Sequence, residues 1–118
     1  MRGYVRIERY DGTAVCERCL VAETPLRRLR GLLGRKTLDA HEGMLLRPVN
    51  AIHMFFMRFA IDAIFVDNEL EVVKVREEVR PWRVSGARGA KGVLELRAGE
   101  ARRRRIAPGD RLRIVEVA

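Results

Sequence analysis

The apolar segment 61–66 (IDAIFV) carries one carboxylate, Asp62. Side chains alternate along a strand, and both faces of this one would be apolar, so we expect Asp62 to be at least partly buried. A buried carboxylate needs a cation or several hydrogen-bond donors. Arg58 is the expected bidentate partner and His53 the second choice. The preferred role of such a pair is to hold the loop 55–60 on the sheet, and the alternative is a pocket floor in which Arg58 binds an anionic or hydroxyl-bearing ligand that Asp62 orients.

Glu95 and Trp82 are the other groups that could serve a ligand near Asp62. Glu95 lies in the strand-like segment 93–96 (VLEL), and two carboxylates sharing a cleft could flank a bond as they do in glycoside hydrolysis. A solvated Glu95 paired to an arginine is the preferred interpretation. Trp82 stands between Arg80-Pro81 and Arg83, so its ring could stack a base or a sugar while the two guanidinium groups bind phosphate or hydroxyls. Equally, Trp82 could fill one end of a barrel.

The densest run of charge lies near the C-terminus, in a chain with 24 Lys+Arg against 16 Asp+Glu and a net charge of +8. A basic surface suits nucleic acid or another polyanion, and such binding weakens steeply with salt. On a short helix, four consecutive arginines would point around most of the circumference and would not form one stripe. A solvated cationic turn is therefore preferred, and weak polyanion binding is the alternative. The run consists of Arg102, Arg103, Arg104 and Arg105.

Two groups of residues invite a metal or redox interpretation. Cys16 and Cys19 form a C-x-x-C pair, but residues i and i+3 of a strand point to opposite faces, and a second pair is missing. Met54 and Met57 beside His53 resemble a soft ligand set for Cu(I), although methionine is more often adaptable core filler. We predict no metal site and no cofactor.

Alternating and apolar runs predict the elements that must position these groups. Asp11-Gly12 supplies a hairpin turn between the first two strands, and Thr24-Pro25 begins the clearest helix, 25–33. Residues 98–105 fit one or two helical turns, and the glycine-rich 85–92 lacks phosphate-loop spacing and is expected to be a flexible loop. The expected strands are 4–9, 13–22, the short run 44–46, 61–66, 70–76, 93–97 and 111–117.

Six or seven short strands with one main helix predict a single α+β, mainly β domain over 1–118. Such strands protect their edges best in a small, partly closed β-barrel or a compact sandwich. No stretch reaches the roughly 18–20 apolar residues that a membrane span needs, and the N-terminus lacks the apolar region of an export signal. We therefore expect a cytoplasmic protein without a membrane partner.

The segment 52–67 (IHMFFMRFAIDAIFVD) resembles the signature of a bacterial and archaeal family, domain of unknown function 192. The resemblance implies a small β-rich domain with an associated helix, and it brings no established activity, substrate or cofactor. Val49, Met54 and Ala60 stand where Cys, Thr and Pro are common in the family, which weakens any role for a thiol or hydroxyl there. Flanking segments that agree in order are RLRGLLGRKTL (28–38), EGMLLRP (42–48), RPW (80–82), VLELRAG (93–99) and IAPGDRL (106–112).

The functional interpretation is a non-enzymatic binding or accessory module for an unidentified small ligand. Its expected face is the loop and strand 53–62 together with Trp82, Arg83 and Glu95. The first alternative is a polyanion- or nucleic-acid-binding protein that uses the run 102–105. The second is a hydrolase-like enzyme that uses the carboxylates of Asp62 and Glu95, which would then have to lie about 5–10 Å apart.

Overall fold

A computed structural model describes residues 4–23 and 35–116 of the chain. The helix expected over 25–33 lies outside these residues. The described elements are β1 (Val5–Arg9), β2 (Ala14–Ala22), β3 (Glu42–Leu46), β4 (Ala51–His53), β5 (Ile61–Val66), β6 (Val72–Val79), β7 (Val84–Gly86), β8 (Gly92–Arg97), α2 (Glu100–Arg103) and β9 (Leu112–Glu116). In these ranges the molecule is mostly β with one short helix, as the sequence predicts.

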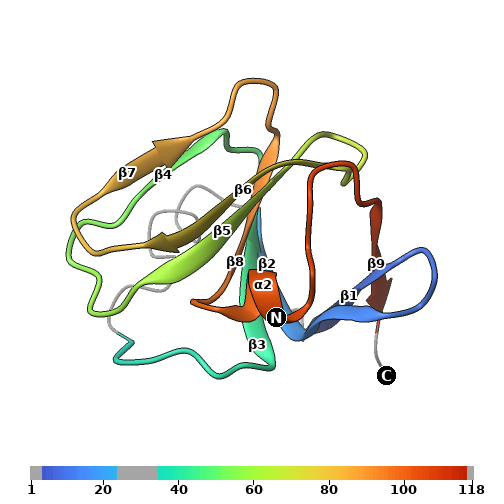
Figure 1. Cartoon of the computed structure of the whole chain (residues 1–118), viewed down its shortest axis with the longest axis horizontal. Helices are drawn as coiled ribbons and strands as arrows, with labels where there is room; N and C mark the ends of the chain where they lie inside the picture. The colour runs from blue at the N-terminus through green and yellow to red at the C-terminus, as the bar shows by residue number, and fades with distance from the viewer. Residues whose placement is uncertain (1–3, 24–34, 117–118) are drawn as a thin grey trace.

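Seven of the strands form one sheet in the order β6-β5-β8-β3-β2-β1-β9, and β4 and β7 form a separate two-stranded sheet (Figure 1). All neighbouring pairs are antiparallel except β2 and β3, which run parallel. The two edge strands of the large sheet meet at one point through a bridge between Glu71 and Arg111. The sheet is not closed into a barrel along its length, so the compact sandwich is the better of the two expected descriptions.

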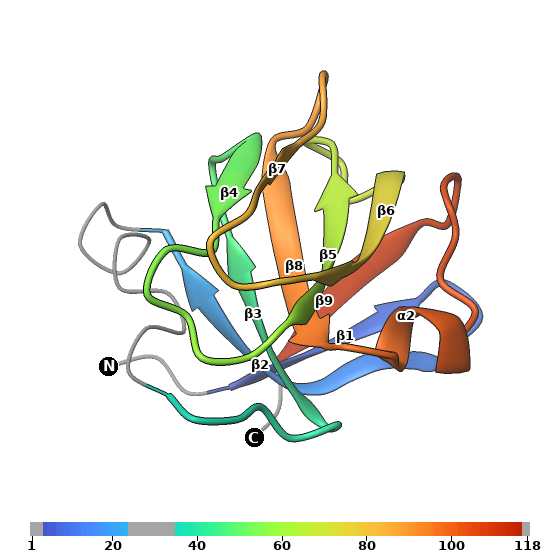
Figure 2. The same ribbon diagram turned by 60° about the vertical axis from the view of Figure 1, so that its left-hand side comes forward.

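Two hydrophobic clusters lie on opposite faces of the large sheet. Ile64 and Val66 of β5 belong to the first cluster with both cysteines and with Ala101 of α2, so α2 caps this face. Ala63 on the same strand belongs to the second cluster, together with Ile52 of β4. Figure 2 shows the small β4–β7 sheet standing beside the large one. The strict alternation along β5 therefore decides which layer each of its side chains contacts.

The predicted strands agree with the structure to within a few residues, and 61–66 agrees at both ends. The structure adds β4 and β7, two strands of three residues that pair only with each other. β7 begins at Val84 and ends at Gly86, so the loop expected over 85–92 is wrong at its start. A three-residue strand is too short to produce a recognisable alternation, because it exists through its pairing. No helix among the described residues is long and apolar enough to cross a membrane.

Candidate functional site

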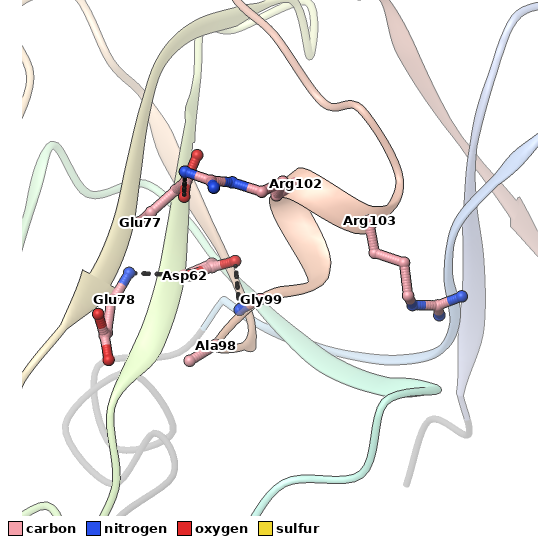
Figure 3. A pocket seen from close by; sticks show the side chains of 7 residues that line it. All are labelled: Asp62, Glu77, Glu78, Ala98, Gly99, Arg102 and Arg103. Atoms are coloured by element: carbon pink, nitrogen blue, oxygen red, sulfur yellow. Dashed lines mark hydrogen bonds and ion pairs between the residues drawn. The ribbon is translucent and has the colours of Figure 1, made fainter.

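The Asp62 side chain is completely buried, as expected, and is held by backbone donors. Its Oδ1 accepts a hydrogen bond from the backbone N–H of Glu78 at 2.8 Å. Its Oδ2 accepts two more, from the N–H groups of Gly99 at 3.0 Å and Ala101 at 2.8 Å. Figure 3 shows the carboxylate between the β6 and α2 backbones. Three donors satisfy a buried carboxylate without a counter-ion, so Asp62 joins β5, β6 and α2.

The expected partners of Asp62 are therefore wrong. Arg58 is exposed, and no ion pair links it to Asp62 in the described part of the chain. His53 also lies elsewhere, because its Nδ1 accepts a hydrogen bond from the backbone N–H of Phe55 at 3.4 Å. The carboxylate faces the α2 side of the sheet, whereas the loop that carries Arg58 follows β4. The prediction fails because backbone N–H groups, which every residue except proline carries, satisfy the Asp62 carboxylate in place of the expected guanidinium.

A hollow of about 530 Å³ lies next to Asp62. Its charged rim is largely neutralised, because Arg102 pairs with Glu77 at 3.2 Å and Arg103 pairs with Glu100 at 2.6 Å. The carboxylate of Asp62 beneath it is already occupied by three donors. This hollow therefore has little free charge with which to hold a ligand. Its lining residues are Asp62, Glu77, Glu78, Ala98, Gly99, Arg102 and Arg103 (Figure 3).

Glu95 lies on the opposite face of the sheet from Asp62. On β8 it is directly opposite Ala63, whereas Asp62 is opposite Leu96. Its other cross-strand neighbour is Met44. The two carboxylates cannot flank one bond across a β-sheet, so the geometry contradicts the shared cleft that the hydrolase alternative requires.

The prediction that Glu95 is solvated and paired with an arginine is also wrong, because only 6% of the residue is exposed. Its carboxylate has no hydrogen bond or ion pair to any described residue. Burial raises the pKa of Glu95 to about 7, because desolvation penalises the ionised form. Glu95 is thus a buried acid that is largely protonated below neutral pH.

The arginine run is mostly committed to ion pairs within the molecule. Arg104 is the extreme case: its side chain is 7% exposed and contacts Glu17 at 2.8 Å and Glu100 at 2.9 Å. The guanidinium groups of Arg103 and Arg104 hold the pKa of the Glu100 carboxyl below its ordinary value. With Arg102 also paired, three of the four arginines have carboxylate partners. This pairing removes most of the charge that the polyanion alternative assigns to the run.

The conspicuous exposed feature is a surface that we call the aromatic double loop, residues 53–56 and 80–84. Trp82 is 58% exposed and Phe56 72% exposed, so Trp82 does not fill a barrel end. The Phe56 and Trp82 rings meet edge-on at 4.9 Å, and Phe55 lies 5.8 Å from Trp82. His53 extends the cluster, with its ring 4.8 Å from that of Phe55. Four rings thus form one continuous, largely exposed surface.

Backbone hydrogen bonds through Met54 join the two halves of the aromatic double loop. The Met54 N–H donates to the carbonyl of Arg83 at 2.7 Å, and the Met54 carbonyl accepts from the N–H of Trp82 at 2.8 Å. Met54 itself is buried. Phe56 and Trp82 both have left-handed backbone angles, with φ of 65° and 71°, which is an unfavourable region for large side chains. The loop pair therefore holds two exposed rings in defined positions.

Three arginines have no carboxylate partner among the described residues, and two of them, Arg80 and Arg83, lie within the aromatic double loop. Arg76, Arg80 and Arg83 line a second hollow, of about 490 Å³, together with Val84. None of the three has a side-chain hydrogen bond or ion pair to a described residue, in contrast to Arg104. The sequence predicts Trp82 between Arg80 and Arg83, and a face over 53–62 that includes Phe56, but Arg76 was missed. The signal available was R-P-W-R at 80–83, whereas Arg76 is brought to the hollow only by the path of β6.

No group of three or more metal-ligating side chains is found in residues 4–23 and 35–116. The prediction that Cys16 and Cys19 point to opposite faces is wrong. A bulge makes the two steps of β1 from Val5 to Ile7 span the three steps of β2 from Cys19 to Cys16. Both thiols consequently lie in the same buried cluster. The hydrogen bond with Cys16, together with burial, raises the pKa of the Cys19 thiol well above its ordinary value, which disfavours the thiolate that binds metals.

Two solved structures have folds closely similar to that of this chain. A crystal structure from Sinorhizobium meliloti 1021, named a "putative transcription regulator", is 26% identical, with a TM-score of 0.82 and 97% of each chain covered. A protein of unknown function from Novosphingobium aromaticivorans is 27% identical, with a TM-score of 0.80 over 93% of this chain and 83% of the other.

Sequence comparison agrees with the structural one. A UPF0127 protein of Thermococcus sibiricus is 35% identical over 98 residues, which are 79% of this chain and 63% of the relative. The chain thus spans less than two thirds of that relative's length. The model of the family DUF192, described as "Uncharacterized ACR", matches residues 7–114. Because that match covers nearly the whole chain, the protein belongs to the DUF192 family, whose function is unknown.

Proposed function

We propose that this chain is a non-enzymatic binding module whose ligand contacts the aromatic double loop. The observation that carries the proposal is the pair Phe56 and Trp82, which are exposed and have left-handed backbone angles. Each such angle costs roughly 1–3 kcal/mol in a residue of this size. A contiguous exposed apolar patch is typical of a binding surface. Rings held in place before binding lose little conformational entropy when a ligand packs on them.

Two further observations support binding over catalysis. Asp62 and Glu95 lie on opposite faces of the sheet, so they offer no acid–base pair. The Sinorhizobium meliloti relative carries the name of a regulator, which is a binding role. These observations favour a binding role for the aromatic double loop over a catalytic role for the two carboxylates.

The test uses Trp82, the only tryptophan, as its reporter. The protein is titrated with three probes: a single-stranded oligothymidylate, phosphatidylglycerol vesicles and a neutral cello-oligosaccharide. We expect one probe to shift the Trp82 emission, and Phe56→Ala to weaken that response about tenfold, since one stacked ring contributes about 1–3 kcal/mol.

Tyr10→Ala is the matched control, because Tyr10 is also an exposed aromatic (63%) but lies at the turn between β1 and β2. We expect it to bind as the wild type does. Circular dichroism verifies that each variant is folded. An emission spectrum unchanged by all three probes contradicts the proposal, and so does an equal loss in Tyr10→Ala.

A further inference from the structure

We propose that the ligand of the aromatic double loop is a single-stranded nucleic acid, an inference that rests on the proposed function and identifies its chemical class. Bases stack on Phe56 and Trp82, and phosphates contact Arg76, Arg80 and Arg83. The polyanion contact is thus moved from the run 102–105 to a different surface. Unpaired charge, exposed rings and the order of arginines and rings along the chain support this ligand class.

The hollow beside the aromatic double loop keeps positive charge after internal ion pairing. The hollow beside the loops is lined by three arginines, Arg76, Arg80 and Arg83, and by two carboxylates, those of Glu77 and Glu78. Glu77 already pairs with Arg102 from outside the hollow. Three cations against one uncommitted carboxylate leave the hollow positive. A guanidinium without an internal partner is a strong bidentate donor to phosphate.

The exposed rings of Phe56 and Trp82 offer surfaces on which bases can stack. Phe56 and Trp82 meet at an interplanar angle of 62°, so their faces point in different directions, and both residues are largely exposed. Every nucleobase has a π-face, and stacking on protein aromatics is the main sequence-tolerant contact in single-strand binding. A duplex keeps its base faces covered. α2, with four residues, is also too short to be a groove-reading helix.

Arginine side chains and an aromatic ring alternate along the segment 80–83. Along the chain, Arg80-Pro81-Trp82-Arg83 has an arginine before and after one tryptophan, as a nucleic-acid strand alternates phosphate and base. A site that inserts into lipid would favour rings separated from charge, so that the apolar tip can leave water. Here the charges adjoin the rings. This order favours a nucleic-acid strand over a lipid surface.

The experiment measures fluorescence anisotropy of a labelled oligothymidylate of about 12 nucleotides, within the usual site sizes. Three phosphate contacts predict an affinity loss of about twentyfold between about 50 and about 200 mM salt. The double variant R80A/R83A leaves one contact, so its loss over the same range falls to about threefold. Phe56→Ala should weaken binding about tenfold while leaving the salt dependence unchanged.

The charge-matched control is R103A/R105A, which removes two arginines from the run 102–105 and leaves the Arg102–Glu77 pair intact. A basic protein binds oligonucleotides weakly through its net charge alone, and this control measures that background. We expect it to keep the affinity and the salt dependence of the wild type. Equal losses in R80A/R83A and R103A/R105A overturn the inference. Duplex binding as tight as single-strand binding also overturns it.

The inference and the proposed function fail in distinguishable ways. If vesicles or the oligosaccharide shift the Trp82 emission and the oligothymidylate does not, the ligand class is wrong and the binding module stands. If none of the three probes shifts it, the proposed function fails as well. The Trp82 emission thus reports on the surface, whereas the arginine variants report on the nucleic acid.

Discussion

Replacing Asp62 by alanine should destabilise the fold by about 3–5 kcal/mol, because three backbone donors lose their acceptor. The N–H of Ala101 is buried, and those of Glu78 and Gly99 are partly buried. An unsatisfied buried donor costs about 1–3 kcal/mol. Water can reach the two partly buried groups in the variant, which keeps the sum below three full penalties. Asp62→Asn should cost about 1.5–3 kcal/mol, because its carbonyl can replace Oδ2 but its amide would face the Glu78 N–H.

Urea denaturation followed by far-ultraviolet circular dichroism measures both free energies of unfolding. Arg58→Ala is the decisive control, because the hypothesis of an Arg58–Asp62 ion pair predicts that it destabilises as much as Asp62→Ala. The backbone-donor geometry predicts a change within about 0.5 kcal/mol for this exposed residue. A loss below about 1 kcal/mol for Asp62→Ala would refute the reasoning. So would a large loss for Arg58→Ala.

Three further predictions concern the buried charges and thiols. Glu95→Gln should stabilise the fold by up to about 3 kcal/mol above pH 7. A folded-state pKa of about 7 for Glu95 makes the stability of the wild type fall as the pH rises from 4.5 to 7. Urea titrations across that range should show the difference between variant and wild type vanish below pH 4.5. Arg104→Ala should cost about 1–3 kcal/mol, because it removes the ion pairs to Glu17 and Glu100 but leaves Glu100 paired with Arg103. The exposed Arg102→Ala should cost less than about 0.5 kcal/mol in the same assay. Cys16 and Cys19, both buried, should resist a thiol-reactive dye in buffer and react together in urea, and fast labelling of the folded protein would contradict their placement.

The sequence predicted elements whose pattern is local. β5 was predicted at both ends because five of its six residues are apolar and the polar Asp67 follows its last residue. The turn at Asp11-Gly12 is equally local, and Gly12 has the positive φ of 92° that such a turn needs. β4 and β7 have no local signal, because three residues become a strand only when a distant partner aligns with them. The fold class was thus accessible, while its smallest sheet was not.

The partner of Asp62 could not be predicted for a different reason. The three donors lie 16, 37 and 39 residues away in sequence, and all are backbone N–H groups. A search by residue type finds guanidinium and imidazole groups but not backbone donors. Likewise, a bulge in β2 reversed the expected placement of Cys19 relative to Cys16. Burial of the carboxylate was predictable from its neighbours, but the identity of its partners depended on the folded backbone.

The distribution of ion pairs explains why the surface with the most arginines in sequence is not the one we propose for binding. The chain has 24 − 16 = 8 more basic than acidic side chains, so cations must remain unpaired somewhere. Around α2, Glu17, Glu77 and Glu100 lie close enough to pair with the run 102–105. At the aromatic double loop no described carboxylate pairs with Arg80 or Arg83. A polyanion gains most where the protein has not already satisfied its own cations, because it then displaces no internal carboxylate. The position of the acids, more than the density of the arginines, therefore decides where a polyanion should bind.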